Sequence, residues 1–154
     1  MIDALRFLSD YAGKYKGRGV NHEGQPFTGV FELEQMPELK GMNLRFRATS
    51  EEGEVYHKEE TTIAQDLAGK TTLWSLCSNF PGMLQLYFRR YETAADDCRT
   101  LVFGLGDLGS QHDYRQEISI DLFRDGSLGY RFAWGMPGGE FSPRSGVRLE
   151  RGHQ

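Results

Sequence analysis

The sequence is poor in cysteine and in long hydrophobic runs. Cys77 and Cys98 are its only cysteines among 154 residues, and they stand in no metal-ligand spacing. Both are therefore expected to be reduced, mostly buried thiols. No apolar run approaches the length of a membrane-spanning helix, and the first residues lack the basic and hydrophobic segments of a secretion signal. These absences favour a cytoplasmic protein that does not interact with membranes.

A strong excess of charge of one sign is also missing. The formal charge at pH 7 is -4 and the sequence pI is about 5.6. Such a balance gives no general attraction to nucleic acid or anionic membranes, so neither is an expected partner. The local basic spots, Lys14, Lys16, Arg18 and the pair Arg89 and Arg90, are expected to be solvated.

The stretch Asp10–Val20, DYAGKYKGRGV, marks the change from a helical to a strand-like pattern. Gly13, Gly17 and Gly19 alternate with basic residues, and Tyr15 is the one bulky residue on the glycine face. Successive side chains of a strand point to opposite faces, so the inner face carries one aromatic ring and several gaps. Such gaps let another backbone approach closely or let the strand bend. The stretch is therefore predicted to be the first strand of a closed barrel that Tyr15 plugs at one end.

The whole chain, 1–154, predicts a single all-β domain with one short helix. Apolar residues at helical spacing over Met1–Ala12 predict a helix that covers one end of the barrel. Ten strands are predicted: Lys14–Val20, Phe27–Gln35, Met42–Ser50, Val55–Gln65, Thr71–Asn79, Met83–Glu92, Arg99–Gly106, Asp113–Phe123, Leu128–Met136 and Arg144–Arg151. Their linkers are short and rich in turn residues, which favours an antiparallel meander. We expect an up-and-down closed barrel rather than a sandwich, because closure removes the exposed edges.

Three features together resemble the calycin superfamily, the lipocalins and fatty-acid-binding proteins. They are the short N-terminal helix, the G-x-aromatic-x-G-x-G pattern at positions 13–19, and the arginine-bearing last strand. The segments GKYKGRGV, WGMPGGEF and VRLER resemble lipocalin-like bacterial families of unknown function more closely. The resemblance implies that Arg148 or Arg151 packs over Tyr15, a contact that contributes ~0.5–2 kcal/mol.

Haem binding is an alternative that a related group suggests. Nitrobindin-like barrels bind haem through a histidine in the late strands. The predicted last strand, Arg144–Arg151, contains no histidine, His112 lies in or beside a turn, and His153 follows the last strand. We therefore expect no cofactor.

The predicted inner faces are rich in aromatic side chains. A barrel of about ten strands encloses a cavity unless side chains fill it, and an apolar wall with a few converging polar groups is typical of a small-molecule pocket. The expected lining residues are Phe31, Phe46, Trp74, Leu86, Phe88, Phe103, Tyr130, Phe132 and Trp134. The alternative is that these side chains simply fill the core. We expect the barrel to bind a small hydrophobic or aromatic ligand rather than to be an enzyme.

His57 and Arg90 are the candidate polar contacts for such a ligand. The fourth predicted strand is polar on both faces, so either His57 and Glu59 or Tyr56 and Glu60 point inward. Because histidine titrates near neutrality, His57 with Glu59 also supports a catalytic alternative, acid-base chemistry on a bound molecule. An inward Arg90 would pair with a ligand carboxylate.

The remaining motifs indicate neither a metal site nor a phosphate loop. HEGQ at His22 is not a two-histidine zinc motif, and no helix follows GLGDLG at Gly104. The strand Thr71–Asn79 is apolar on both faces. Its outer side is expected to be covered by the helix or by a second subunit, which favours a homodimer.

Overall fold

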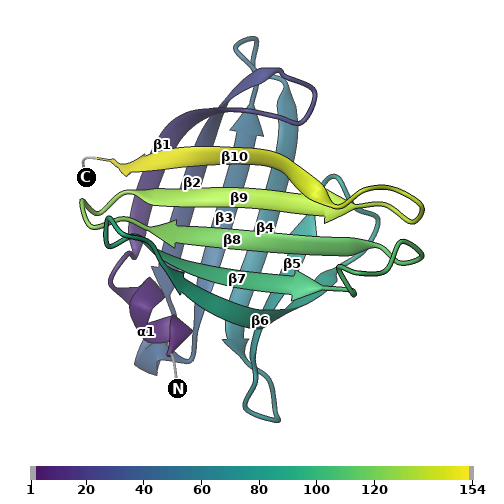
Figure 1. The fold of residues 1–154 in the computed structure, drawn as a ribbon. Helices are drawn as coiled ribbons and strands as arrows, with labels where there is room; N and C mark the ends of the chain where they lie inside the picture. Colours follow the sequence, from purple (N-terminus) through teal and green to yellow (C-terminus); the bar gives the residue numbers. More distant parts are fainter. Residues whose placement is uncertain (1–2, 153–154) are drawn as a thin grey trace.

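The chain forms a closed barrel of ten antiparallel strands, as predicted (Figure 1). A computed structural model describes residues 3–152. Each strand pairs with the next, and β1 pairs with β10 to close the barrel. The strands are β1 (Gly13–Val20), β2 (Pro26–Gln35), β3 (Gly41–Thr49), β4 (Val55–Gln65), β5 (Thr71–Cys77), β6 (Leu84–Thr93), β7 (Arg99–Leu105), β8 (Arg115–Leu122), β9 (Leu128–Gly135) and β10 (Ser142–Arg151), with a 3-10 turn η1 (Pro37–Leu39) after β2. All ten predicted strands are confirmed, with ends that shift by at most two residues.

One short helix, α1 (Ala4–Ser9), lies against one end of the barrel (Figure 1). It is shorter than the predicted Met1–Ala12, whose first two residues lie outside the described part of the chain. Asp3 caps it by accepting a hydrogen bond from the Arg6 amide, and its buried Leu5 and Leu8 join the barrel core. The expected covering of one barrel end is thus confirmed. Within residues 3–152, no helix is long and apolar enough to cross a membrane.

Tyr15 plugs the barrel at this end. Its ring is buried, and its hydroxyl donates to the backbone oxygen of Tyr11 at 2.6 Å. Arg151 donates to the same hydroxyl at 2.8 Å, and its guanidinium carbon lies 5.3 Å from the ring centroid. Arg148 instead lies over Phe123, at 3.9 Å. Of the two arginines that the resemblance implied, Arg151 is therefore the one that packs on Tyr15.

The glycines of β1 allow the barrel to close. A Cβ atom at Gly17 would overlap the carbonyl oxygen of Arg148 and lie 3.1 Å from the Cα of Leu149. The backbone of β10 therefore occupies the space that a side chain on β1 would need. The close approach of another backbone at this gap is confirmed.

Alternation assigns the inner faces of most strands correctly, but it misplaces Trp74. The predicted inward residues of β2, β3 and β8 are buried in the core. In β5, Leu73 lies opposite core residues of both neighbouring strands, so the adjacent Trp74 points to the outer face. The expectation that Trp74 lines the interior is therefore wrong. It lies on the same outer face as Leu76 and Tyr87, which are 53% and 44% exposed, and self-association through this strip stays a prediction.

A β-bulge in β6 places both Arg89 and Arg90 on the outer face. Phe88 lies opposite Phe103, whereas Arg90 lies opposite the next residue, Val102, so Arg89 is the extra residue of the bulge. A bulge interrupts the alternation of side chains. The expected inward orientation of Arg90 is therefore wrong.

Both cysteines are free thiols, as predicted. Cys98 is buried, and Cys77 is half-buried on the inner face of β5. Burial raises the pKa of each thiol, so both remain protonated and unreactive near neutral pH.

Candidate functional site

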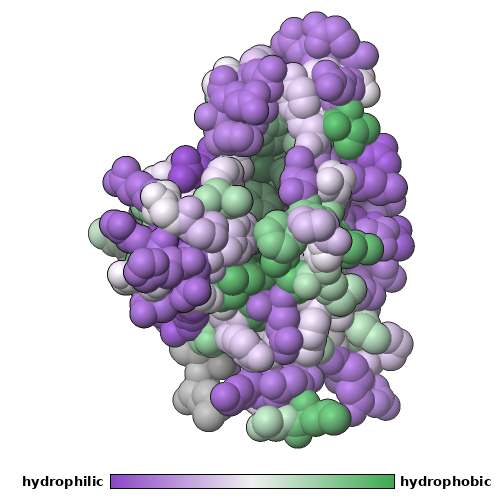
Figure 2. Space-filling model, turned by 90° about the vertical axis from the view of Figure 1, so that its right-hand side faces the viewer, coloured by the Kyte–Doolittle hydropathy of each residue, from purple (hydrophilic) through white to green (hydrophobic). Residues whose placement is uncertain are grey.

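The two ends of the barrel are filled differently. Interior aromatic residues toward α1, such as Tyr15 and Phe31, are fully buried, whereas His57, Phe132 and Trp134 toward the opposite end are partly exposed. Figure 2 looks onto this opposite end and shows a hollow with an apolar floor between hydrophilic rims. His57, Phe132 and Trp134 point into the barrel. Since they are nevertheless partly exposed, solvent enters the barrel at the end opposite α1.

We call this hollow the mouth cup and define it by Phe46, His57, Gln116, Phe132 and Trp134. The ring centroids of His57 and Phe46 are 5.8 Å apart, and those of His57 and Phe132 are 5.5 Å apart. Gln116 on β8 lies directly opposite Trp134 on β9. Strands β3, β4, β8 and β9 thus each contribute to one aromatic-walled site with polar groups in it.

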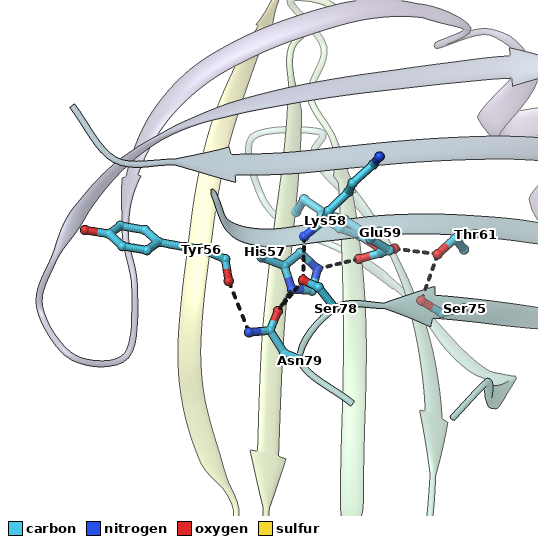
Figure 3. Close-up of polar contacts among 9 residues, drawn as sticks. Tyr56, His57, Lys58, Glu59, Thr61, Ser75, Ser78 and Asn79 are labelled. Atoms are coloured by element: carbon cyan, nitrogen blue, oxygen red, sulfur yellow. Dashed lines mark hydrogen bonds and ion pairs between the residues drawn. The ribbon is translucent and has the colours of Figure 1, made fainter. Parts of the chain in front are cut away.

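A buried polar network lies beneath the cup (Figure 3). Glu59 is only 2% exposed, and its Oε2 accepts hydrogen bonds from Tyr130 and Thr61, each at 2.5 Å. Its Oε1 lies 3.1 Å from Nε2 of His57. Ser75 extends the network through the Thr61 hydroxyl at 2.9 Å. A buried carboxylate requires such partners, so these side chains hold Glu59 in place.

Asn79 fixes the orientation of the His57 ring. The side-chain amide of Asn79 donates to the backbone oxygen of Tyr56 at 3.1 Å, which leaves its Oδ1 as an acceptor, 2.5 Å from Nδ1 of His57. Nδ1 therefore carries a hydrogen. A hydrogen bond between Nε2 and Oε1 of Glu59 also requires a hydrogen on one of these two atoms. His57 and Glu59 therefore hold this hydrogen between them. Both ring nitrogens of His57 are engaged within the protein (Figure 3).

Burial keeps three tyrosines protonated to high pH. It raises the pKa of Tyr130 well above its usual range, an effect that the nearby Glu59 carboxylate strengthens. It also raises the pKa of Tyr114 to about 12, and that of Tyr15 despite the opposing charge of Arg151. Above the unfolded pKa of about 10 the folded state therefore binds more protons than the unfolded state, and stability falls as pH rises.

We accordingly expect three of the seven tyrosines to resist ionisation in the folded protein. An alkaline titration followed by the ultraviolet absorbance of phenolate should show these three ionising only at or beyond the pH of unfolding. Ionisation of Tyr15, Tyr114 and Tyr130 near pH 10, with the fold intact by circular dichroism, would contradict this.

The structure brings four of the predicted site residues together. Phe31, Phe46 and Tyr130 pack with ring centroids 5.2 to 6.3 Å apart, and His57 contacts Phe46. Trp134 lies in the mouth cup with the Arg144 guanidinium 4.2 Å from its ring. The other three lie elsewhere: Phe88 packs against Phe103 with a centroid distance of 5.6 Å, and Trp74 and Arg90 are on the outer face.

Gln116 and Asn79 are site residues that the sequence reasoning missed. Gln116 holds an inward position of β8, two residues before Ile118, so alternation alone could have identified it as the polar member of an apolar face. Asn79 follows β5 in a turn, and its contact with His57 depends on turn geometry that no periodicity reports.

Arg90 lies in a groove on the outer face of the barrel, which shares Phe132 with the mouth cup. This outer groove has a volume of about 480 Å³ and is lined by Arg90, Glu92, Val102, Glu117, Ser119, Arg131, Phe132, Ala133, Phe141, Pro143, Arg144, Ser145 and Gly146. Arg90 donates to both oxygens of Glu117, at 2.7 and 3.1 Å, and to Glu92 at 2.6 Å. These carboxylates already satisfy its guanidinium, so Arg90 is poorly placed to receive a ligand carboxylate.

The described histidines do not fit an axial haem ligand inside the barrel. Both nitrogens of His57 are engaged, and His22 and His112 are exposed in loops. His153 lies outside the described residues. Within residues 3–152, no three His, Cys, Asp or Glu side chains are grouped to hold a metal ion.

Comparison with known proteins shows a shared fold. No protein-family model matches the sequence, and no curated protein matches it. The crystal structure of Rv2717c from M. tuberculosis aligns with a TM-score of 0.71 and 15% identity over 99% of both chains. A de novo designed fluorescence-activating β-barrel aligns with a TM-score of 0.47 and 15% identity over 99% of this chain and 100% of the design. The similarity to Rv2717c shows the barrel fold alone, and membership of the calycin superfamily stays a prediction.

Proposed function

We propose that the mouth cup binds a small hydrophobic molecule with an aromatic ring. The observation that carries this proposal is the gradient of burial along the interior. The barrel is filled toward α1 but leaves inward aromatic side chains accessible at the opposite end. An apolar wall with a few fixed polar groups is the usual composition of a ligand site, and ligand binding is also what the resemblance to lipocalins implies.

The ligand would lie against Phe46 and Phe132, whose ring centroids are 6.5 Å apart and whose planes are tilted by 38°. Aromatic rings favour such tilted and edge contacts with one another. His57 packs against both rings, with centroids 5.8 and 5.5 Å away, and is held by Asn79 and Glu59. A side chain fixed in this way loses little entropy on binding, which favours a preformed site.

Titration calorimetry with 2-acetylnaphthalene tests this proposal. We expect saturable binding to the wild type, and about tenfold weaker binding to Trp134→Ala, because the variant loses one aromatic wall. Phe141→Ala is the matched control, since Phe141 lines the outer groove and should leave the affinity unchanged. Equal weakening by both substitutions, or by Phe141→Ala alone, would contradict binding in the cup.

Proton transfer to a bound molecule is a second candidate, favoured by the 3.1 Å contact between His57 and Glu59. It requires His57 to exchange its contact with Glu59 for one with the substrate. The methyl group of 2-acetylnaphthalene is acidic enough to report this chemistry. In heavy water, catalysis would speed the exchange of the methyl hydrogens for deuterium. An exchange rate equal to that without protein would contradict catalysis and would not affect the proposal of ligand binding.

A further inference from the structure

Gln116 brings to the mouth cup a hydrogen-bond donor that has no partner among residues 3–152. Gln116 is 6% exposed, and its Oε1 accepts a hydrogen bond from the Tyr114 hydroxyl at 2.9 Å. Its side-chain nitrogen, Nε2, donates to no other side chain or backbone group among the described residues. An amide N–H that is largely buried without a partner is costly, so this group requires an explanation.

Nε2 of Gln116 must face the cup. No fully buried side-chain nitrogen or oxygen within residues 3–152 lacks a hydrogen-bond partner, so Nε2 touches accessible space. Gln116 shares the inner face of β8 with Ile118 and lies opposite Leu105 and Trp134. The accessible space on that side is the open end of the barrel.

His22 and Arg144 also pack against Trp134, and Arg144 donates to the backbone oxygens of Trp134 and Glu140. Three further polar side chains near the cup are already committed. Asn79 and Glu59 engage both nitrogens of His57, and the Tyr114 hydroxyl donates to Gln116 itself. An apolar ligand that enters the cup would displace water from Nε2 and would leave this donor without a hydrogen-bond acceptor. A ligand with an acceptor oxygen would replace that water, and sites with a buried polar group reject analogues that lack its partner.

We propose that Gln116 determines specificity, by selecting aromatic molecules that carry a hydrogen-bond acceptor oxygen, such as an aryl ketone. This inference rests on the proposed function and names the ligand class within it. Gln116 positions the acceptor oxygen of the ligand, while the aromatic walls bind the rest of the molecule.

The test compares 2-acetylnaphthalene with 2-ethylnaphthalene, which has nearly the same shape and no oxygen. We expect the wild type to prefer the ketone by about tenfold, the value of one net hydrogen bond of about 1.4 kcal/mol. In Gln116→Met, which keeps the chain length and loses the amide, the preference should fall below about twofold while the affinity for 2-ethylnaphthalene is retained. Gln85→Met, on the exposed outer face of β6, is the control and should keep the full preference.

Gln116→Glu provides a second variant if Gln116→Met does not fold. It keeps the acceptor for Tyr114 but replaces the donor by another acceptor, so the ketone should lose its advantage. An undiminished preference in either folded variant, or equal binding of both compounds by the wild type, would overturn this inference and leave the proposed function standing. Failure of the wild type to bind either compound would overturn both.

Discussion

Replacing Gly17 with alanine is expected to destabilise the protein by about 3 kcal/mol or more, although it adds a single methyl group. Overpacking usually costs about 1–3 kcal/mol, and the upper end applies where backbone must move. Here the added carbon would overlap the carbonyl oxygen of Arg148, which belongs to the strand that closes the barrel. Relief requires β1 and β10 to separate, and that exposes two strand edges.

Chemical denaturation of the variant, followed by circular dichroism, measures this loss. Gly82→Ala is the matched control, because a Cβ at Gly82 meets no atom within 4 Å, and we expect a change within about 0.5 kcal/mol. Similar stability for the two variants would show that β1 and β10 do not approach as closely as the structure shows.

Replacing Glu59 with alanine is the second large expected effect, a loss of about 3–5 kcal/mol of unfolding free energy. The substitution removes the acceptor of the Tyr130 and Thr61 hydroxyls and the partner of His57. The two hydroxyls lie on buried residues, so their desolvation is no longer compensated. A cavity in the barrel interior adds to the loss.

Glu60→Ala provides the control for Glu59, since the next residue on β4 points outward and its side chain is 64% exposed. Its ion pair with Arg45, at 3.6 Å, should contribute less than about 1 kcal/mol. Glu59→Gln should fall between the two, because it keeps one acceptor oxygen and replaces the other by an amide nitrogen. Equal denaturation midpoints for Glu59→Ala and Glu60→Ala would contradict the network beneath the cup.

The sequence predicts the barrel well because two simple signals repeat along it. Turn residues between short segments locate all ten strands, and alternation in strands such as β3 separates core from surface. The alternation of glycine with larger residues in β1 also predicts both the Tyr15 plug and the close approach of another strand. Each of these features depends on local sequence alone.

The candidate site is harder to predict because it depends on where alternation fails or is ambiguous. The bulge after Phe88 turns Arg90 outward, and a bulge has no reliable sequence signal. Trp74 lies on a strand that is apolar on both faces, so its orientation depends on register. His57 and Glu59 point inward, which is one of the two alternatives that the sequence pattern of β4 allows. Their partners Asn79 and Tyr130 belong to distant segments, so these contacts have no local sequence signal.

The most direct test of the account is amide NMR of the isotope-labelled protein during titration with 2-acetylnaphthalene. Binding in the mouth cup predicts that the largest shift changes cluster at Phe46, His57, Gln116 and Trp134, and that they saturate together. Shift changes centred instead on outer-groove residues such as Phe141, or no changes at the solubility limit of the ligand, would contradict ligand binding in the barrel.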